Sequence, residues 1–527
     1  MATTRAEDGM PLRTGADDLV ATLVGGGVRL CLANPGTSEM HFVAALDRSD
    51  GMRCVLALFE GVATGAADGY YRMARQPAAT LLHLGPGFAN GAANLHNAKK
   101  AGSGVVNVVG EHATFHIAYN APLTADIEGL ARPVSHWVRT NDSVASLGSD
   151  GAEAVREARS GAGRIASLIV PADIAWSAGT GIAAPVPAPE PLRPASAEAI
   201  AAAAETLRAG PSSLLLVGGT AMTARGKQLA AAIAAKTGCS LRSPISSPRT
   251  ERGAGRVEIA RVPYAGDQAI EALKDIGQVV LCGTRQPVSN FAFPDRSNVL
   301  TRPDCRFVPL AAPDDDLVAT LEALAEAVGA TARDVAVPER PKPERPSGPL
   351  TPEGIARAIT ALLPEGTIVA DEAVTTGRGW AALTAAAAPH DWLQNTGGSI
   401  GYGMPVAIGA ALACPDRPVL CLEGDGSAMY TSQSLWTMAR EGLDVTVVIL
   451  ANRAYQILKA QLPRVGIANP GRRSLDMLTL DRPAIDWVAM ARAHGVEAGQ
   501  ATDLDSLVRQ LNRGFAVRGP YLIEVVL

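Results

Sequence analysis

The sequence predicts an α/β protein made of three domains in series, each a parallel β-sheet covered by helices. With 527 residues, the chain is too long for a single hydrophobic core. Short runs rich in β-branched residues and leucine alternate with alanine-rich helical stretches along the sequence, a pattern typical of parallel sheets. Two proline-rich stretches interrupt this alternation and predict surface linkers between the domains.

The linkers are expected at residues 183–191 and 337–354. They separate an N-terminal domain (1–182), a central domain (192–336) and a C-terminal domain (355–527). The strands expected in the first domain are RLCLANPG, ATLLHLGPG, GVVNVVGEH and RIASLIVPAD. Those of the central domain are SSLLLVGGTA and IGQVVLCGT, and those of the last are GTIVADEA, RPVLCLEGDGS and DVTVVILANRAY.

The composition excludes several classes of protein. The net charge is −5 and no lysine and arginine cluster forms a basic stripe, so nucleic acid is not an expected partner. No apolar segment is long enough to span a membrane, and the acidic N-terminal stretch is unlike a secretory signal, so a cytoplasmic protein is expected. The seven cysteines contain no CxxC pair, which predicts reduced thiols rather than disulfides or a zinc site.

Polar residues follow two apolar runs in the last third of the chain. Gly424, Asp425 and Gly426 end one expected strand, and Asn452 follows the next. Adjacent parallel strands end at one edge of a sheet, where a strand–turn–helix offers backbone N–H groups to a phosphate. A carboxylate and an amide oxygen also suit Mg²⁺, the usual companion of a diphosphate. Taken alone, a GDG sequence is far more often an ordinary tight turn than a metal site.

The GDG sequence and the spacing from Asp425 to Asn452 resemble the cofactor motif of thiamine diphosphate enzymes, such as acetolactate synthase and benzoylformate decarboxylase. The resemblance implies three Rossmann-like parallel-sheet domains, with a pyrimidine-binding and a diphosphate-binding domain flanking a central one. It also implies that Mg²⁺ is held by Asp425, the Asn452 side chain and the carbonyl of Ala454. The other residues expected at the diphosphate are Gly424, Gly426, Ser427 and Tyr455.

The resemblance assigns further cofactor contacts in two other segments. In LFEGVATGAADGYYRMA, Glu60 would hydrogen-bond the aminopyrimidine ring and favour its imino tautomer; a charge placed at a helix N-terminus is the alternative. In NTGGSIGYGMPVAIGAALA, Gly398 would offer its carbonyl to the amino group. Ile400 would support the bent cofactor, and an ordinary core position is the alternative for this residue.

Three residues of the N-terminal domain are expected on the substrate side. His83 lies where benzoylformate decarboxylase has a catalytic histidine, and Thr37 lies where that enzyme has a serine. A histidine titrates near neutral pH and can relay protons, although His83 is also compatible with a hydrogen-bonded histidine at a strand end. His112 is expected to line the pocket. The remaining wall is expected to consist of Gln456, Ile457 and Leu458. Such an apolar wall favours a 2-oxo acid with a hydrocarbon or aryl side chain.

The resemblance implies decarboxylation of a 2-oxo acid to an enamine, followed by carboligation as in acetolactate synthase. The alternatives are a decarboxylase that releases an aldehyde and a non-catalytic regulatory homologue. A nucleotide-binding enzyme is disfavoured because no GxGxxG precedes an acidic ribose ligand. FAD, which acetolactate synthases carry, has no supporting motif in the central domain. Because the family completes each site with two subunits, at least a homodimer is expected, and a homotetramer is the common form.

Overall fold

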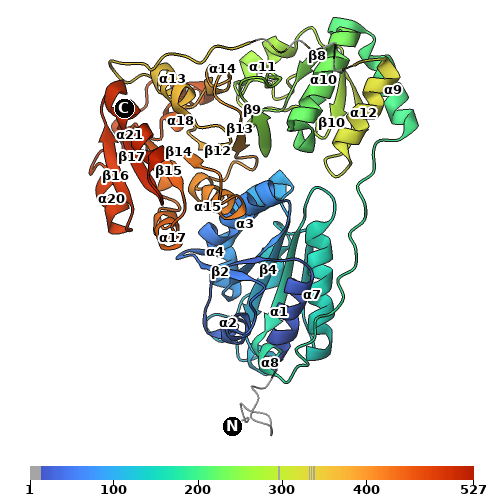
Figure 1. The fold of residues 1–527 in the computed structure, drawn as a ribbon, viewed down its shortest axis with the longest axis vertical. Coiled ribbons are helices and arrows are strands. Elements are labelled where there is room, and N and C mark those ends of the chain that lie inside the picture. Colours follow the sequence, from blue (N-terminus) through green and yellow to red (C-terminus); the bar gives the residue numbers. More distant parts are fainter. Residues whose placement is uncertain (1–12, 295–296, 332, 334, 336, 338) are drawn as a thin grey trace. The chain divides into compact units, whose positions relative to one another are not determined.

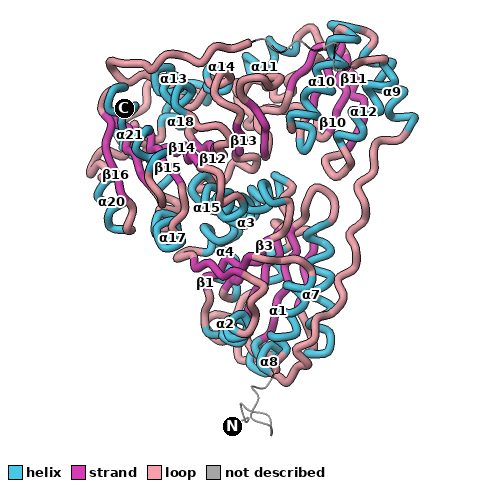
Figure 2. Tube along the Cα trace, in the orientation of Figure 1, coloured by secondary structure: helices cyan, strands magenta, loops and turns pink. Residues whose placement is uncertain are grey.

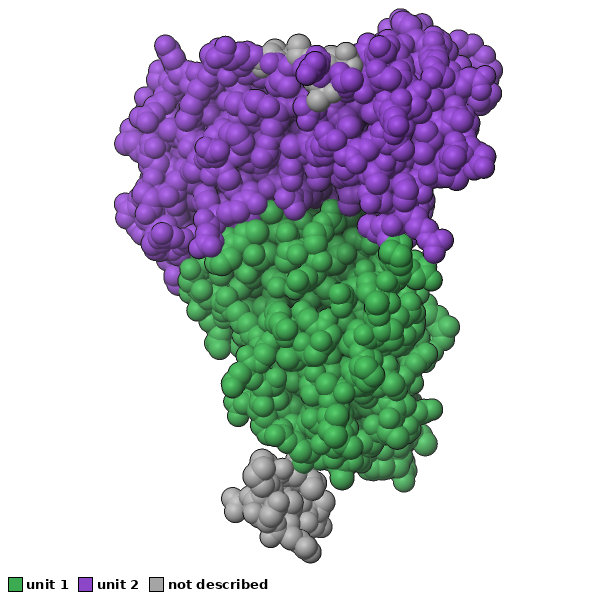
Figure 3. All heavy atoms as spheres, turned by 45° about the vertical axis from the view of Figure 1, so that its right-hand side comes forward, with its two compact units in different colours: residues 1–191, 397–415, 431–443 green, residues 192–396, 416–430, 444–527 purple. Residues whose placement is uncertain are grey.

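The computed structural model describes residues 13–294, 297–331, 333, 335, 337 and 339–527. Parts of the expected N-terminal domain (1–12), central domain (295–296, 332, 334 and 336) and second linker (338) lie outside the described residues. The described residues form two compact units, coloured separately in Figure 3. The first contains the residues up to Pro191 together with Gly397–Pro415 and Thr431–Leu443. The second contains Leu192–Thr396, Asp416–Tyr430 and Asp444–Leu527.

The predicted fold class is confirmed: the chain contains three sheets, mostly parallel, with helices packed on them (Figures 1 and 2). The first unit holds a six-stranded parallel sheet in the order β2-β1-β3-β4-β6-β5. Its strands are β1 (Leu30–Asn34), β2 (Arg53–Leu56), β3 (Ala78–Leu82), β4 (Val105–Glu111), β5 (Trp137–Thr140) and β6 (Ile165–Pro171). Every residue of β3, β4 and β6 is buried, as expected for strands covered on both faces.

Helices cover both faces of this sheet. The helices of the first unit before Pro191 are α1 (Gly15–Gly25), η1 (Thr37–Glu39), α2 (Met40–Asp47), α3 (Glu60–Ala74), α4 (Leu84–Ala101), α5 (Thr114–Ile117), α6 (Ile127–Ala131), α7 (Val144–Arg159) and α8 (Ala172–Trp176). Helices α1, α2 and α7 share a core with the sheet face that carries Val106 and Val108. Two later helices complete the unit, α15 (Gly403–Ala413) and α17 (Ser434–Glu441).

The second unit begins with a four-stranded parallel sheet in the order β11-β10-β7-β8. Its strands are β7 (Ser213–Val217), β8 (Ser240–Arg242), β10 (Gln278–Cys282) and β11 (Arg306–Ala311). Its helices are α9 (Ala197–Leu207), η2 (Gly210–Ser212), η3 (Gly219–Met222), α10 (Ala224–Thr237), α11 (Gly266–Leu273) and α12 (Leu317–Val328). This sheet has apolar cores of its own, one of them built on Leu215, Val217 and Val280.

A seven-stranded sheet completes the second unit, in the order β16-β17-β15-β14-β12-β13-β9. Its strands are β9 (Arg249–Arg252), β12 (Ile368–Glu372), β13 (His390–Gln394), β14 (Val419–Gly424), β15 (Val445–Ala451), β16 (Glu497–Ala501) and β17 (Tyr521–Val526). Its helices are α13 (Pro352–Leu362), α14 (Trp380–Leu383), α16 (Asp425–Ala428), α18 (Gln456–Lys459), η5 (Leu462–Val465), α19 (Arg472–Asp476), α20 (Trp487–Ala493) and α21 (Leu504–Ala516). No helix in the described part of the chain is both long and apolar enough to cross a membrane.

Strand β9 is an unexpected member of this sheet. It comes from the central part of the chain and pairs antiparallel with β13, whereas every other pairing in the sheet is parallel. Arg249 Nε donates to Asp391 Oδ1 at 2.7 Å across this pairing. The sequence RTER has no apolar alternation, so nothing in its pattern predicts a strand. The four residues are nevertheless ordered as an edge strand by pairing with the C-terminal sheet.

Helix α3, which begins at Glu60, packs closely against α15 in the first unit. A Cβ at Gly69 would overlap the Val406 carbonyl, and a Cβ at Gly409 would overlap the Ala66 carbonyl. Only glycine lets the two backbones approach this closely. The contact fixes the position of α3 and therefore of Glu60 at its start.

A buried ion pair lies in the same helix. Arg72 and Asp68 are 2% and 0% exposed, and Arg72 donates to both carboxylate oxygens of Asp68 at 2.7 Å. Arg72 also donates to the Tyr402 hydroxyl at 3.0 Å, and the Ser103 hydroxyl donates to Asp68 at 2.5 Å. All polar groups of this cluster are therefore engaged away from water.

We expect Asp68→Ala to lower the free energy of unfolding by about 3–5 kcal/mol, because it leaves the Arg72 charge buried without its partner. Chemical denaturation monitored by circular dichroism measures this loss. Removing both charges, with Asp68→Ala and Arg72→Met together, should recover much of the stability. The exposed pair of Glu128 and Arg132 provides the control, since Glu128→Ala should cost less than about 1 kcal/mol. Equal losses from Asp68→Ala and Glu128→Ala would contradict the prediction.

Candidate functional site

The predicted site residues lie in two groups, one in each compact unit. In the first unit, Glu60 is the first residue of α3 and is 7% exposed. Asn90 Nδ2, on α4, donates to Glu60 Oε2 at 3.0 Å. Gly87 lies against the other oxygen, since a Cβ there would be 2.9 Å from Oε1. The carboxylate is thus held at a helix N-terminus, where a negative charge is favourable.

Helix α4 also holds the segment 397–401, which contains the predicted contacts Gly398 and Ile400. Asn97 Nδ2 donates to the Ser399 carbonyl at 2.8 Å, and the Ser399 N–H donates to Asn97 Oδ1 at 3.0 Å. Gly398 has a φ of +81°, which favours glycine, and Ile400 is 36% exposed. One helix therefore positions both Glu60 and the segment predicted to contact the cofactor.

The asparagines of α4 were missed in the sequence. Asn90, Asn94 and Asn97 are spaced by four and three residues, which places them on one face of the helix. Asn94 Nδ2 donates to the carbonyls of Gly61 and Gly401, at 2.8 and 3.2 Å. The helical spacing of three amides in an alanine- and glycine-rich helix is the signal that would have identified this face.

The predicted substrate-side residues follow three neighbouring strands. Thr37 follows β1, His83 follows β3 and His112 follows β4. These strands are adjacent in the order β1-β3-β4 and parallel, so the three residues lie along the carboxyl edge of the sheet, where ligands bind in open α/β sheets. The His112 N–H donates to Glu111 Oε1 at 2.7 Å, and the His112 ring lies edge-on to His116 with centroids 5.3 Å apart.

His83 has a carboxylate partner, Glu39, that was not identified in the sequence. The distance from His83 Nδ1 to Glu39 Oε2 is 2.8 Å, and Glu39 is 3% exposed. Burial raises the pKa of the Glu39 carboxyl, against hydrogen bonds from Gly36 and His83 that lower it. Burial likewise raises the pKa of Glu111. The edge thus carries two buried acidic side chains beside its histidines.

In the second unit, Asp425 and Asn452 follow the paired strands β14 and β15. Asp425 is 4% exposed, and its Oδ2 accepts a hydrogen bond of 2.6 Å from the Arg453 N–H. The Gly426 N–H donates to Oδ1 at 2.9 Å. The structure therefore joins the two turns directly, with the carboxylate of one turn bound to the backbone of the other.

The carbonyl of Ala454 points to the same side as the Asn452 amide. The segment 453–455 pairs with 478–480 through one N–H···O bond on each side of Ala454. In an antiparallel pair this leaves the N–H and carbonyl of Ala454 directed away from 478–480. On that side Asn452 Oδ1 accepts from the Ala454 N–H at 3.1 Å.

The remaining predicted residues surround these turns. The Tyr455 ring lies against Gly426, since a Cβ there would be 2.6 Å from the ring Cε1. Ser427 is 8% exposed, next to the Gly424 turn at the start of α16. The predicted wall residues lie on α18, where Ile457 is half-buried and Gln456 and Leu458 are exposed.

These oxygen atoms fit a hard divalent cation. The donor set would be the Asp425 carboxylate, the Asn452 amide oxygen and the Ala454 carbonyl, all ligands that suit Mg²⁺. Burial raises the pKa of Asp425, against the hydrogen bonds from the Arg453 and Gly426 N–H groups, and a cation would offset this cost of burying the charge. Within the described residues no three His, Cys, Asp or Glu side chains gather into a metal site. A cation here would thus need the amide and carbonyl oxygens.

Two family models match the chain. Residues 13–128 match "Thiamine pyrophosphate enzyme, N-terminal TPP binding domain", and residues 374–525 match "Thiamine pyrophosphate enzyme, C-terminal TPP binding domain". The first match contains Glu60 and His83, and the second contains Asp425 and Asn452.

Relatives and solved structures agree with these matches. A Mycobacterium tuberculosis protein with the provisional name acetolactate synthase large subunit is 48% identical, over 97% of this chain and 98% of its own length. Benzoylformate decarboxylase of Pseudomonas aeruginosa is 29% identical, over 95% of this chain and 96% of its own. The solved 4-hydroxybenzoylformate decarboxylase of Rhodococcus jostii has a TM-score of 0.83 at 23% identity, over 98% of this chain and 99% of its own, and shows the shared fold.

Proposed function

Because the chain belongs to the family of thiamine pyrophosphate enzymes, we propose that it decarboxylates a 2-oxo acid and joins the remaining fragment to a second carbonyl compound. Thiamine diphosphate, when bound, supplies the stabilisation of negative charge on the carbon that loses CO₂. The observation that carries the proposal is the presence of two groups of residues suited to the two ends of the cofactor, called half-sites below. One is the buried Glu60 held by α4, and the other is the Asp425 carboxylate joined to the Asn452 turn.

Glu60 is proposed to act at the pyrimidine end of the cofactor. Its carboxyl group hydrogen-bonds the aminopyrimidine ring and holds the proton that favours the imino tautomer. Asn90 keeps the carboxyl in place through its 3.0 Å bond to Oε2, and the segment with Gly398 and Ile400 is held by the same helix. Burial excludes water from this carboxyl, which strengthens its hydrogen bond to the ring.

Asp425, Asn452 and the Ala454 carbonyl are proposed to hold Mg²⁺ and, through it, the diphosphate. The turn formed by Gly424, Asp425 and Gly426 at the end of β14 brings backbone N–H groups to the phosphates. A non-catalytic regulatory homologue would have no physical need for a buried carboxylate at each half-site, which argues against that alternative.

The likeness to the M. tuberculosis relative supports carboligation as the outcome. His83 favours a second candidate, a decarboxylase that releases an aldehyde, because an oriented histidine at the substrate edge can give a proton to the carbon that lost CO₂.

The proposed assembly is at least a homodimer, with a homotetramer as the expected form. Sedimentation velocity of the purified protein measures this state.

The test is an incubation with thiamine diphosphate, Mg²⁺ and either pyruvate or benzoylformate, followed by CO₂ and product analysis. We expect CO₂ together with an acyloin or a 2-hydroxy-2-alkyl-3-oxo acid. Free aldehyde as the only product would contradict carboligation and support the second candidate, a decarboxylase that releases an aldehyde. No CO₂ from a wider panel of 2-oxo acids would overturn the proposed function.

We expect His83→Phe to lower kcat by about 10²-fold if His83 transfers a proton, while substrate still binds. Steady-state kinetics that separate kcat from KM measure this effect. Replacing the exposed His116 with Phe serves as the control on the same edge of the sheet. Unchanged kcat in His83→Phe would remove His83 from the reaction and leave the cofactor half-sites unaffected.

A further inference from the structure

Two hydrogen bonds converge on one oxygen of the buried Glu39 carboxyl group. The Gly36 N–H donates to Oε2 at 2.7 Å, and His83 Nδ1 lies 2.8 Å from the same atom. The second oxygen, Oε1, is buried and has no hydrogen-bond partner among the described residues. The carboxyl is thus asymmetric, with one oxygen engaged by the His83 side and the other turned into the protein interior.

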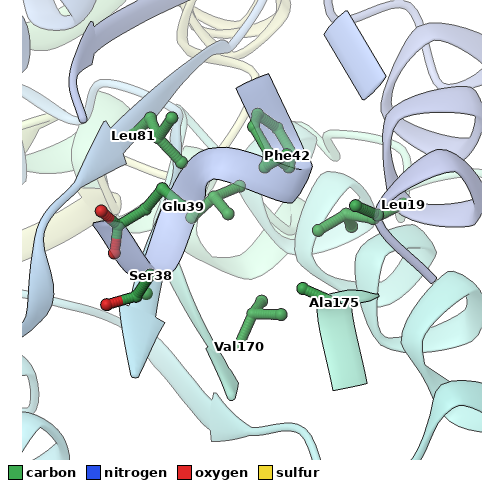
Figure 4. A pocket seen from close by; sticks show the side chains of 10 residues that line it. Leu19, Ser38, Glu39, Phe42, Leu81, Val170 and Ala175 are labelled. Atoms are coloured by element: carbon green, nitrogen blue, oxygen red, sulfur yellow. The ribbon is translucent and has the colours of Figure 1, made fainter. Parts of the chain in front are cut away.

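The interior side of Glu39 is closed. A small cavity of about 10 Å³ lies beside it, lined mostly by apolar side chains that include Leu19, Phe42 and Val170 (Figure 4). This volume is at the lower limit for a single water molecule. Oε1 also lies directly against Gly110 of β4, where a Cβ would overlap it. The carboxyl therefore has no room to turn away from His83.

The His83 ring is fixed from its other side. A Cβ at Gly36 would overlap the ring, so the imidazole packs on the bare backbone of the loop after β1. The ring is 24% exposed and follows β3 at the N-cap of α4. The backbone of Gly36 and the carboxyl of Glu39 together hold the ring in one orientation.

This arrangement selects one tautomer of the histidine. Oε2 accepts from the Gly36 N–H, and a carboxylate oxygen can only accept from Nδ1. A protonated carboxyl would instead donate its hydrogen from Oε2 to Nδ1, so the selection of this tautomer requires the ionised carboxyl. Beside the ionised carboxyl, Nδ1 therefore carries hydrogen, and the neutral ring keeps its lone pair on Nε2.

We propose that Glu39 is a positioning residue, which holds His83 as the Nδ1–H tautomer and leaves Nε2 as the atom that exchanges protons with the substrate. The part of this proposal that concerns the substrate rests on the proposed function. An acidic group that orients a histidine in this way has a large effect on proton transfer, because it fixes which ring nitrogen takes up and releases the proton at the substrate.

Other titratable side chains lie on the elements around this pair. Helix α2 carries His41, whose ring packs edge-on to Trp176 with centroids 5.9 Å apart. The end of β4 carries Glu111 and His112, and Glu111 is engaged with the His112 N–H. His41 and Glu111 thus have contacts of their own, whereas Nδ1 of His83 is directed at Glu39.

The test is ¹⁵N solid-state NMR of histidine-labelled protein loaded with thiamine diphosphate and Mg²⁺, without substrate. A His83→Gln variant assigns the His83 signals by their loss. In the unaltered protein, at a pH where the ring is neutral, we expect a protonated Nδ1 and an unprotonated Nε2. A protonated Nε2 in the unaltered protein would overturn the proposal, whatever the rate of turnover.

Variants then test whether Glu39 causes the Nδ1–H preference of His83. Glu39→Leu should abolish the Nδ1–H preference and lower kcat about 10- to 100-fold with a smaller change in KM. Glu39→Gln should restore part of both, because its amide oxygen can accept from Nδ1. Glu111→Gln, which alters a buried carboxyl on the same edge, should leave the His83 signals unchanged. Retention of the Nδ1–H preference in Glu39→Leu would contradict the proposal.

The readouts separate this inference from the proposed function. If the tautomer follows Glu39 but no 2-oxo acid is consumed, the positioning of His83 stands and the proposed function fails. If substrate is turned over while His83 carries Nε2–H, the proposed function stands and the role of Glu39 is wrong.

Discussion

Glu60→Gln is expected to lower kcat by about 10²- to 10⁴-fold while thiamine diphosphate still binds. The amide is nearly the same size as the carboxyl, and its oxygen can still accept the hydrogen bond from Asn90. The variant therefore keeps the local structure but removes the group that exchanges a proton with the pyrimidine ring. Steady-state kinetics measure the loss, and calorimetric titration with the cofactor measures binding.

Asn90→Ala is the matched control for Glu60, because it removes the hydrogen bond to the carboxyl but leaves the carboxyl itself. A smaller loss of kcat than in Glu60→Gln is expected. If Glu60→Gln retained full turnover, Glu60 would have no part in proton exchange, and its burial at the start of α3 would have only a structural meaning.

Asp425→Ala is expected to weaken Mg²⁺-dependent binding of thiamine diphosphate by about 10²-fold or more, as for the loss of about 3 kcal/mol on removing one partner of a buried charged contact. The neutral amide of Asn452 cannot balance the cation alone. Titration calorimetry with thiamine diphosphate, with and without Mg²⁺, measures the change. Asp425→Asn should show the same loss, since its side-chain oxygen can still accept from the Arg453 N–H and keep the turn folded.

Asp391 provides the control for this effect. It is also 4% exposed and lies in the same sheet, where it is bound to Arg249 and Arg417. Asp391→Asn should lower stability but leave the Mg²⁺ dependence of cofactor binding intact. Equal weakening in Asp391→Asn and Asp425→Asn would mean that unfolding, rather than loss of a ligand, explains the effect.

The fold class follows from the sequence because its signal is local. Strands such as β4 and β15 are covered on both faces, so each is a continuous apolar run that can be recognised without tertiary information. Strand β9 has no such signal, since its four residues are charged or polar and become a strand only through β13. Pairing between distant segments can override local preference.

The predicted site also contains residues with a local sequence signal and residues without one. Glu60, Asp425 and Asn452 occur in motifs with characteristic neighbours and spacing, so their positions could be proposed directly. Glu39 lies five residues after β1 in a short turn, and nothing nearby reveals that it will be buried against Gly110. Its importance arises from contacts with two other strands, which the order of residues along the chain does not display.

Strand β9 belongs by sequence to the central part of the chain but lies in the C-terminal sheet. This placement limits which segments of the chain can be replaced by those of its relatives. A central segment transplanted from another family member would carry the outermost strand of the following sheet with it. The transplanted segment would then need a residue that can replace Arg249 beside Asp391, and a strand whose register matches β13. A mismatch would leave an unpaired strand edge, which is prone to aggregation. Substitutions in β9 and in β13 are therefore expected to be correlated among family members.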